Sequence, residues 1–399
     1  MSVPPDFPFP QGRPPEPPDA YARLRREEPV SLVTTPTGDV AWITTRHDDV
    51  QAVFADPRFS RAAVLRPGAP RSSHLDGLSG VSLLSMDDPG HGRLRRLVAS
   101  AFTARRVESL RERTEGICAG LLDDMAEAGP PADLMSHLAV QLPVIVICEL
   151  LGVPSRDHVR FRAWSSEFFA TADLDAGGVL RAYAELTAYI AGLVAAKREE
   201  PADDLLSALI TARDEGDRLS EEELVNLTMT ILIAGHETTT NQIANSVVTL
   251  FRHPGQLAAL RADPSLVPRA VEELLRYSPL SSGGGLIRIA TEEVELSGTT
   301  ISAGEGVIPI SGAANRDPGV FPEPDRFDLG RERNPHLAFG HGIHHCLGAQ
   351  LARMELQVAL AALLRRFPGL RLAIPDGELP WRQGIITNAL SSLPLTWVA

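Results

Sequence analysis

Lysine, cysteine and long apolar runs are all scarce in this sequence of 399 residues. Lys197 is the sole lysine among 38 basic residues, so arginine carries nearly all of the positive charge and no arginine is notable by its type alone. The three cysteines, Cys118, Cys148 and Cys346, are odd in number and too far apart to suggest a disulfide framework. We therefore expect a reducing, cytoplasmic location.

No uninterrupted apolar run reaches the length of about 18 residues that a membrane span requires. The most apolar stretch, residues 142–153, contains Pro143 and Glu149, so we expect no membrane partner. The net charge of −13 argues against nucleic acid as a partner, because phosphate binding requires clustered cations. Residues 1–20 are rich in proline and lack the pattern of a signal peptide. They predict an N-terminal arm, followed by a single domain over residues 21–399.

Helical periodicity dominates the middle of the chain, whereas strand patterns are short and lie near its two ends. Apolar runs on both sides of Pro36-Thr37-Gly38-Asp39 predict a β-hairpin. Strands are expected within residues 30–35, 40–44, 294–310, 370–374 and 395–398, and residues 58–85 predict a long loop. Helices are predicted over residues 94–126, 159–169, 179–200, 221–252, 268–277 and 351–366. The expected fold is mainly α, one large helical domain with a small β-rich lobe.

Cys346 lies in the most informative segment, F-G-H-G-I-H-H-C-L-G-A over residues 339–349. It precedes a predicted helix, whose free N–H groups and dipole stabilise a thiolate, the form of cysteine that binds metals. Glycines at 340, 342 and 348 allow sharp turns and a close approach to a flat ligand, as a planar macrocycle would need. This segment therefore predicts a metal-binding thiolate beside a flat ligand.

Two other interpretations of this segment are a buried structural cysteine in a glycine-rich turn and a zinc site. The zinc ligands would be His341, His344, His345 and Cys346. Three of these four are consecutive in the sequence, unlike the paired spacing of usual zinc sites. Zinc is the weaker alternative.

The predicted helix over residues 221–252 is apolar around nearly its whole circumference, as expected for a helix inside a large core. Ser220 and Glu223 form a capping-box pattern at its start. Its centre nevertheless reads A-G-H-E-T-T, and burying a carboxylate and hydroxyls without partners is costly. A solvent-facing polar patch is the alternative, but this motif occurs together with the cysteine segment and favours a functional role.

Small residues within that motif would admit a flat ligand to the helix backbone. Ala234 and Gly235 supply them, although glycine inside a helix costs about 1 kcal/mol relative to alanine. Thr238, one turn after Ala234, is placed to donate to the Ala234 carbonyl and bend the helix. The bend is expected to open a groove over the metal.

Two further pairs lie one helical turn apart. His91 and Arg95 can face one anion together, although a solvated basic surface is the alternative. Glu273 and Arg276 form an E-x-x-R pair that elsewhere contributes only a few tenths of a kcal/mol. On these grounds alone Glu273 and Arg276 are an ordinary surface pair.

These motifs occur in family order along nearly the whole chain, and the cysteine segment resembles the haem-binding signature of the cytochrome P-450 monooxygenases. The chain is similar to the actinobacterial members that tailor macrolides and other polyketides. The resemblance implies haem b lying between the long central helix and the cysteine loop, with Cys346 as axial metal ligand. It further implies that Glu237 and Thr238 deliver protons to iron-bound dioxygen. It also implies that Glu273 and Arg276 are structural, with Arg326 as a third partner. The remaining residues expected to bind the cofactor are His91, Arg95, Ala234, Gly235, Arg288, Phe339, Gly340, His344 and Gly348.

The resemblance also implies a small apolar organic substrate, expected to contact Leu83, Leu84, Ile233 and Ile287. Electrons from NAD(P)H would arrive through a reductase and a ferredoxin, because the chain has no flavin or dinucleotide fingerprint. Arginines near His91 and after Cys346 favour an acidic ferredoxin. Two alternatives remain open, a peroxide-driven peroxygenase and a non-catalytic haem or small-molecule binder. The Glu237 and Thr238 pair argues against the first, since a peroxygenase does not need to protonate dioxygen.

Overall fold

The computed structural model describes residues 3–73, 76, 82–158, 160, 164, 176–214, 219–382 and 387–398. The chain forms two compact units, each made of two separate chain segments. Unit 1 comprises residues 1–93 and 269–347, and unit 2 comprises residues 94–268 and 348–399. Two helices run from one unit into the other, α3 (Gly90–Ala99) and α12 (Val267–Tyr277).

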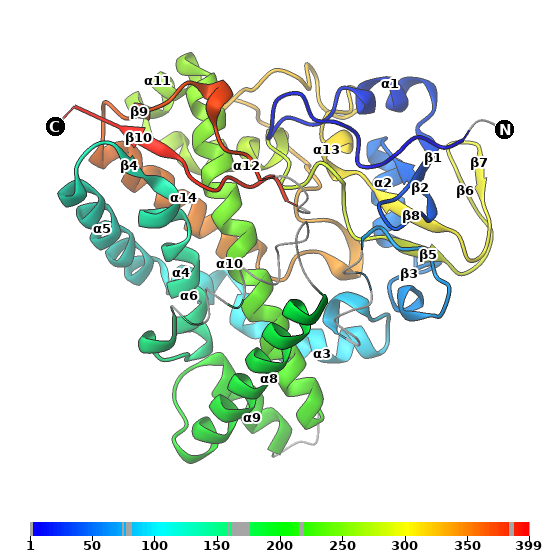
Figure 1. Ribbon diagram of the computed structural model, residues 1–399, viewed down its shortest axis with the longest axis horizontal. Helices are drawn as coiled ribbons and strands as arrows, with labels where there is room; N and C mark the ends of the chain where they lie inside the picture. The colour runs from blue at the N-terminus through cyan, green and yellow to red at the C-terminus, as the bar shows by residue number, and fades with distance from the viewer. Residues whose placement is uncertain are drawn as a thin grey trace. The chain divides into compact units, whose positions relative to one another are not determined.

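Unit 1 contains the β-rich part of the chain. Its five-stranded sheet has the order β1-β2-β8-β5-β3, and a two-stranded sheet pairs β6 with β7. Blue and yellow strands lie side by side in Figure 1 because β2 and β8, far apart in the sequence, pair in parallel. Its elements are α1 (Ala20–Glu27), β1 (Val30–Thr34), β2 (Val40–Thr44), α2 (His47–Ala55), β3 (Phe59–Ser60), η1 (Ala62–Leu65), η2 (Leu83–Ser85), β5 (Arg288–Ala290), β6 (Val294–Leu296), β7 (Thr299–Ile301), β8 (Gly306–Pro309), α13 (Ser311–Ala314) and η7 (Gly342–His344).

The predicted hairpin is confirmed by the antiparallel pairing of β1 with β2, in which Leu32 faces Trp42. Alternate residues of β1 and β2, among them Val33 and Ile43, are fully buried in one apolar cluster. The N-terminal arm contributes to the same cluster, because Phe7 is buried in it and its N–H donates to the Thr34 carbonyl at 2.9 Å. The arm therefore packs against the sheet of unit 1.

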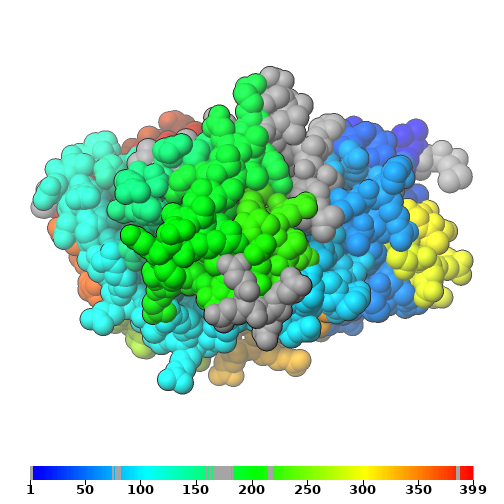
Figure 2. Space-filling model, turned by 90° about the horizontal axis from the view of Figure 1, so that it is seen from below, coloured from blue at the N-terminus to red at the C-terminus, as the bar shows by residue number. Residues whose placement is uncertain are grey.

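Unit 2 contains most of the helices. The long helix α10, green in Figure 1, packs against α6, α8 and α14. A three-stranded sheet has the order β4-β10-β9. The neighbouring helices α8 and α9 form a continuous green surface in Figure 2. Its elements are η3 (Ser100–Phe102), α4 (Ala104–Glu108), α5 (Arg111–Ala128), β4 (Ala132–Asp133), the π-helix η4 (Met135–Ala139), α6 (Gln141–Leu151), η5 (Ser155–Asp157), α8 (Ala176–Glu199), α9 (Leu205–Asp214), α10 (Glu221–Arg252), α11 (Pro254–Ala262), η6 (Pro264–Leu266), α14 (Ala349–Arg366), β9 (Arg371–Leu372), η8 (Asp376–Glu378) and β10 (Pro394–Thr396).

The predicted helix over residues 94–126 is wrong as a single element. Thr103 adopts an extended conformation and accepts from the Arg106 N–H as an N-cap, so α4 starts afresh after it. The predicted helix over residues 159–169 lies almost entirely outside the described residues. The mainly α fold with small sheets is confirmed, and within the described parts of the chain no helix is long and apolar enough to cross a membrane.

Candidate active site

Cys346 is exposed and follows η7 in a turn that comes just ahead of α14. Its N–H donates to the Phe339 carbonyl at 2.9 Å, which closes the loop. Gly340 and Gly342 have φ of 70°, and a Cβ at Gly342 would lie 2.6 Å from the Phe54 carbonyl oxygen. The prediction of tight turns is thus confirmed for these two glycines. Gly348 has a φ of −84°, and its role beside a flat ligand stays a prediction.

Burial separates Cys346 from the other two cysteines. Cys118 and Cys148 are fully buried, and desolvation raises the pKa of each thiol to about 12. Neither can readily form the thiolate that ligates a metal. Among the described residues, which include all four candidate zinc ligands, no group of three or more His, Cys, Asp or Glu side chains could hold a metal ion. The structure therefore favours Cys346 as a single thiolate ligand over a zinc cluster.

A cluster of basic side chains lies in unit 1. The rings of His91 and His344 have centroids 4.4 Å apart, and Arg288 stacks 4.7 Å from the ring centroid of Phe54. Burial lowers the pKa of Arg288 to about 9, with a further contribution from the charge of Arg61. The pKa of His344 falls to about 3, first because of burial and then because of His91, Arg288 and Arg61. We call Arg61, His91, Arg288 and His344 the basic cluster.

The basic cluster fits the propionates of haem. Buried cations repel one another unless an anion compensates them, and two carboxylates would supply that charge. Asp87 acts favourably on Arg61, Arg288 and His344, and Asp76 acts favourably on Arg61, so the charges of the cluster are partly offset and a bound carboxylate would add to that compensation at Arg288 and His344. The Nε2 atom of His344 is also buried without a hydrogen-bond partner among the described residues. Arg95, half-buried one turn after His91 on α3, is placed as the sequence predicts within that helix.

The centre of α10 departs from its otherwise buried character. Ala234 is exposed and Thr238 is half-buried, whereas the flanking turns are buried. The Thr238 hydroxyl donates to the Ala234 carbonyl at 3.0 Å, which confirms the predicted bond. A Cβ at Gly235 would lie 2.8 Å from Cγ1 and Cδ1 of Ile147, so this glycine lets α10 pack closely on α6. Its predicted role in binding a flat ligand stays a prediction.

Glu237 is buried in α10, with 9% of its surface exposed. Burial raises the pKa of its carboxyl group, while the Asn241 amide and the charge of Arg382 act in the opposite direction. Asn241 Nδ2 donates to Glu237 Oε1 at 3.3 Å and to Thr387 Oγ1 at 3.1 Å. A carboxyl group in such surroundings can hold a proton at a pH where an exposed one would be ionised.

The predicted substrate contacts differ in exposure. Leu84 is 44% exposed, whereas Leu83 and Ile233 are buried with 7% and 8% exposed. Ile287 has no exposed surface and belongs to the core cluster of unit 1. A side chain without exposed surface offers no area to a substrate unless its neighbours move, so the contact role of Ile287 stays a prediction.

The E-x-x-R pair is a buried structural centre. Arg276 donates to both carboxylate oxygens of Glu273, at 2.7 and 2.8 Å, and neither side chain is more than 1% exposed. The expectation that Arg326 is the third partner is wrong for its side chain, which pairs with Glu323 instead; Arg326 contributes only its carbonyl. Arg331 supplies the missing cation, with Nε 3.1 Å from Glu273 Oε2.

Sequence reasoning missed Arg61 and Arg331. Both are arginines whose partners include carbonyl oxygens of distant segments, namely Leu84 and Ile287 for Arg61 and Pro322 for Arg331. In a chain with so many arginines, residue type gives no signal for such contacts. Burial, which only the fold supplies, identifies them.

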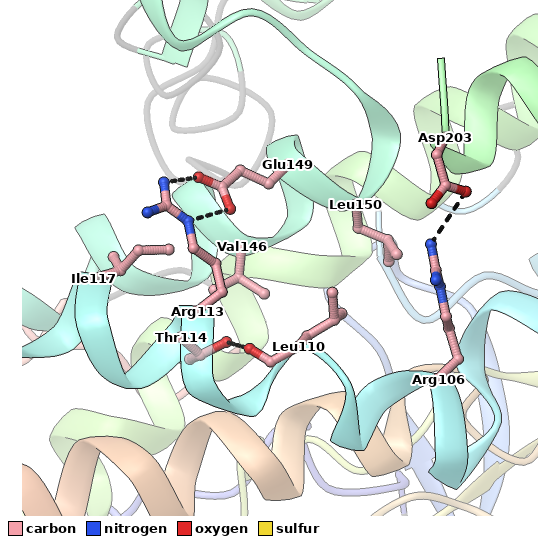
Figure 3. Close-up of a pocket in the computed structure, with 9 residues that line it drawn as sticks. All are labelled: Arg106, Leu110, Arg113, Thr114, Ile117, Val146, Glu149, Leu150 and Asp203. Carbon is pink, nitrogen blue, oxygen red and sulfur yellow. Dashed lines mark hydrogen bonds and ion pairs between the residues drawn. The ribbon is translucent and has the colours of Figure 1, made fainter.

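A small pocket of about 150 Å³ in unit 2 contains none of the predicted site residues. Its wall includes the Arg113–Glu149 pair, with hydrogen bonds of 2.7 and 3.1 Å, and the Arg106–Asp203 pair at 3.6 Å (Figure 3). Arg106, Leu110, Arg113, Thr114, Ile117, Val146, Glu149, Leu150 and Asp203 line it. Its cations already face carboxylates, so it offers no excess charge to an ionic ligand.

A family model described as Cytochrome P-450 matches residues 179–370. Nocardicin C N-oxygenase of Nocardia uniformis subsp. tsuyamanensis is 52% identical to this chain, with 94% of each sequence covered. Mycinamicin IV hydroxylase/epoxidase of Micromonospora griseorubida is 51% identical, also over 94% of each sequence. The fold agrees with a solved structure of a variant of the mixed-function P-450 MycG in complex with mycinamicin IV. That structure has a TM-score of 0.92 and 49% identity, and the alignment covers 99% of this chain and 100% of that one.

Proposed function

Because the chain belongs to the cytochrome P-450 family, we propose that it inserts one oxygen atom from O2 into a macrolide- or polyketide-type molecule, with electrons from a ferredoxin and its reductase. The protein is a haem-dependent monooxygenase whose cofactor is haem b with a thiolate ligand, and NAD(P)H electrons reach it through redox partners. The observation that carries the assignment within this chain is the contrast in burial between the exposed Cys346 and the buried Cys118 and Cys148.

Residues of each unit have separate tasks in this proposal. In unit 1, Cys346 would hold the iron through its thiolate, and the basic cluster would bind the propionates. When bound, haem supplies the activation of O2 that no side chain can perform. Cys346 contributes electron density to that chemistry.

In unit 2, Glu237 and Thr238 of α10 handle protons. The raised pKa of Glu237 lets its carboxyl group hold a proton, and the Asn241 amide orients the carboxyl oxygen. The hydroxyl of Thr238 donates to the Ala234 carbonyl, so its oxygen is left to accept a hydrogen bond from the solvent or ligand side. This pair supports dioxygen, and not peroxide, as the oxidant.

The names of the relatives support two types of oxidation. One relative is named as a hydroxylase/epoxidase of mycinamicin IV, and another as an N-oxygenase of nocardicin C. We favour oxidation at carbon, because two relatives are named as hydroxylases, the mycinamicin IV hydroxylase/epoxidase at 51% identity and the vitamin D(3) 25-hydroxylase of Pseudonocardia autotrophica at 46% identity. Oxidation at nitrogen is the second candidate, on the strength of the 52% identity. Spectral titration with macrolides and with nocardicin C would separate the two.

The decisive experiment compares Cys346→Ser with the parent protein. The parent should contain stoichiometric haem and show the red-shifted Soret band of a thiolate-ligated ferrous carbon monoxide complex, and Cys346→Ser should lose that band. Cys148→Ala is the control, because the buried Cys148 thiol should leave the band unchanged. A parent protein that holds stoichiometric zinc and no haem would refute the proposal. Turnover with peroxide alone, at the rate seen with ferredoxin and reductase, would favour the peroxygenase instead.

A further inference from the structure

Arg61 is buried in unit 1, with 5% of its surface exposed, and it joins two chain segments through their carbonyl oxygens. Its Nε donates to the Leu84 carbonyl at 2.8 Å, and its Nη1 donates to the Ile287 carbonyl. Leu84 belongs to the turn η2, whereas Ile287 directly precedes β5. One guanidinium therefore connects the turn η2 to the start of β5, an inner strand of the sheet.

Asp87 holds the other end of the same turn. One carboxylate oxygen of Asp87 accepts a hydrogen bond from the backbone N–H of Arg61 at 2.9 Å. The other accepts from the Ser60 hydroxyl at 2.5 Å. The turn itself is closed by the Ser82 N–H, which donates to Ser85 Oγ at 2.9 Å. The segment over residues 82–87 is thus fixed to β3 by Asp87 and to the residue before β5 by the Arg61 side chain.

The charge of Arg61 acts on other members of the basic cluster. Burial lowers the pKa of Arg61, and Asp76 and Asp87 partly compensate for that effect. The charge of Arg61 in turn lowers the pKa of Arg288 and of His344. The charge of Arg61 therefore acts on both residues that are expected to bind an anion.

We propose that Arg61 is a positioning residue for substrate, which ties the turn carrying Leu83 and Leu84 to the segment carrying Ile287 and Arg288. The inference rests on the proposed function, because it takes this turn as part of the substrate-binding surface. The tie uses two donors of the planar guanidinium, which point to different carbonyls. A lysine ammonium keeps the charge but is a compact group at the end of a flexible chain and cannot replace both donors in the same geometry.

The difference between arginine and lysine separates the effect of the two hydrogen bonds of Arg61 from the effect of its positive charge. Arg61→Lys keeps the positive charge of the basic cluster and loses the pair of hydrogen bonds to the Leu84 and Ile287 carbonyls, whereas Arg61→Gln loses both the charge and the pair of hydrogen bonds. The exposed Arg66→Gln, from the same segment, is the matched control. We expect Arg61→Lys to retain the haem content of the parent protein and Arg61→Gln to lose part of it.

The test measures amide hydrogen exchange over residues 82–87, haem content, and the affinities of imidazole and 4-phenylimidazole from the Soret shift. Imidazole needs only the iron, whereas the phenyl group also needs an ordered pocket wall. For both Arg61 variants we expect about tenfold faster exchange in residues 82–87 and about tenfold weaker 4-phenylimidazole binding, with imidazole affinity within about twofold of the parent.

The inference would be overturned if Arg61→Lys showed the hydrogen exchange of the parent over residues 82–87 and the same ratio of 4-phenylimidazole to imidazole affinity as the parent. Equal weakening of both imidazoles would also overturn it, because that result means general damage to the haem site. A parent protein without haem would refute the proposed function instead. The exchange comparison between Arg61→Lys and Arg66→Gln would still decide whether Arg61 fixes the turn, so the two failures are distinguishable.

Discussion

The imidazole rings of His91 and His344 lie 4.4 Å apart between centroids, tilted by 51°, although the residues are roughly 250 positions apart in the sequence. Two imidazoles in contact, next to buried guanidinium groups, are stable neighbours when both are neutral or when an anion accepts their hydrogen bonds. The low pKa of His344 reflects the first condition, since its surroundings penalise a charge. The haem propionates would supply the second.

His344→Ala should therefore weaken haem retention without preventing folding. The variant removes a buried ring nitrogen that has no hydrogen-bond partner among the described residues and that can donate to a carboxylate. Hydrogen bonds to charged groups contribute about 1.5–3 kcal/mol, so haem transfer to apomyoglobin should be about tenfold or more faster. His345→Ala is the control, since His345 is exposed. Equal transfer rates for His344→Ala and the parent would remove His344 from the cofactor site.

Thr238→Ala should uncouple electron consumption from product formation. The variant removes a half-buried hydroxyl from the centre of α10 and leaves the backbone helical, so substrate affinity should change little. The fraction of NAD(P)H recovered as product should fall severalfold, with hydrogen peroxide accounting for the loss. Thr230→Ala is a close control, because Thr230 donates in the same way to the Asn226 carbonyl on the same helix. The prediction is contradicted if the two variants give the same product yield per NAD(P)H.

Glu355 gives a prediction about stability and pH. It is fully buried in α14, neither carboxylate oxygen has a hydrogen-bond partner among the described residues, and burial raises its pKa to about 8. The folded state then binds a proton that the unfolded state releases above its ordinary pKa of 4.5. Stability is therefore lost as the pH rises from 4.5 to 8, by an amount on the order of 5 kcal/mol at most.

Glu355→Gln removes this titration. Its free energy of unfolding should match that of the parent near pH 4.5 and exceed it at pH 8, as measured by denaturant unfolding at both values. The exposed Glu199→Gln should follow the parent at every pH. A constant difference between Glu355→Gln and the parent over this range would show that Glu355 is ionised, or neutral, in both states.

Reversing the charge of arginines on this protein tests whether they form the docking surface for the proposed acidic ferredoxin. Within unit 2, α4 packs against α14, and Arg96, Arg105 and Arg365 are exposed. Arg106 and Arg366 face Asp203 at 3.6 Å and Asp123 at 3.2 Å, so their charges are partly offset. Reversing Arg93 and Arg96 to Glu should slow reduction by ferredoxin several-fold at low salt and leave substrate affinity unchanged.

The difference should shrink as salt rises, because screening acts over about 8 Å at physiological ionic strength. Arg23→Glu on α1, which is exposed and paired with Glu27, is the control for a change in net charge. Reduction rates that match the parent at both low and high salt would show that these arginines do not take part in docking.

Patterns that involve neighbouring residues were predictable from the sequence. The Ser220–Glu223 capping box is confirmed by reciprocal hydrogen bonds of 2.8 and 3.1 Å, and α10 begins and ends as predicted, at Glu221 and Arg252. The bond from Thr238 to Ala234 is likewise confirmed, because both residues lie on one helix. Such features depend on spacing within a single element, which the sequence contains.

Features that depend on distant segments were not predictable. Gly235 has a packing role because Ile147 of another helix lies against it. The choice of Arg331 over the side chain of Arg326 beside Glu273 follows from the path of the long loop after α13, in which both arginines lie. The role of Arg61 depends on two carbonyl groups, which every residue has. Sequence patterns do not indicate which carbonyl group a long side chain will contact in the folded protein.

The division of unit 1 into two chain segments affects when the protein can take up its cofactor during synthesis. His91 belongs to the first segment, whereas Arg288 and His344 belong to the second, which follows the first segment of unit 2 in the chain. At about 5–20 residues per second, a ribosome needs roughly 10 to 50 s to travel from His91 to His344. During that interval β2 also lacks its parallel neighbour β8. Ribosome-bound chains arrested before Arg288 should therefore retain no haem, and cofactor uptake should await the nearly finished polypeptide.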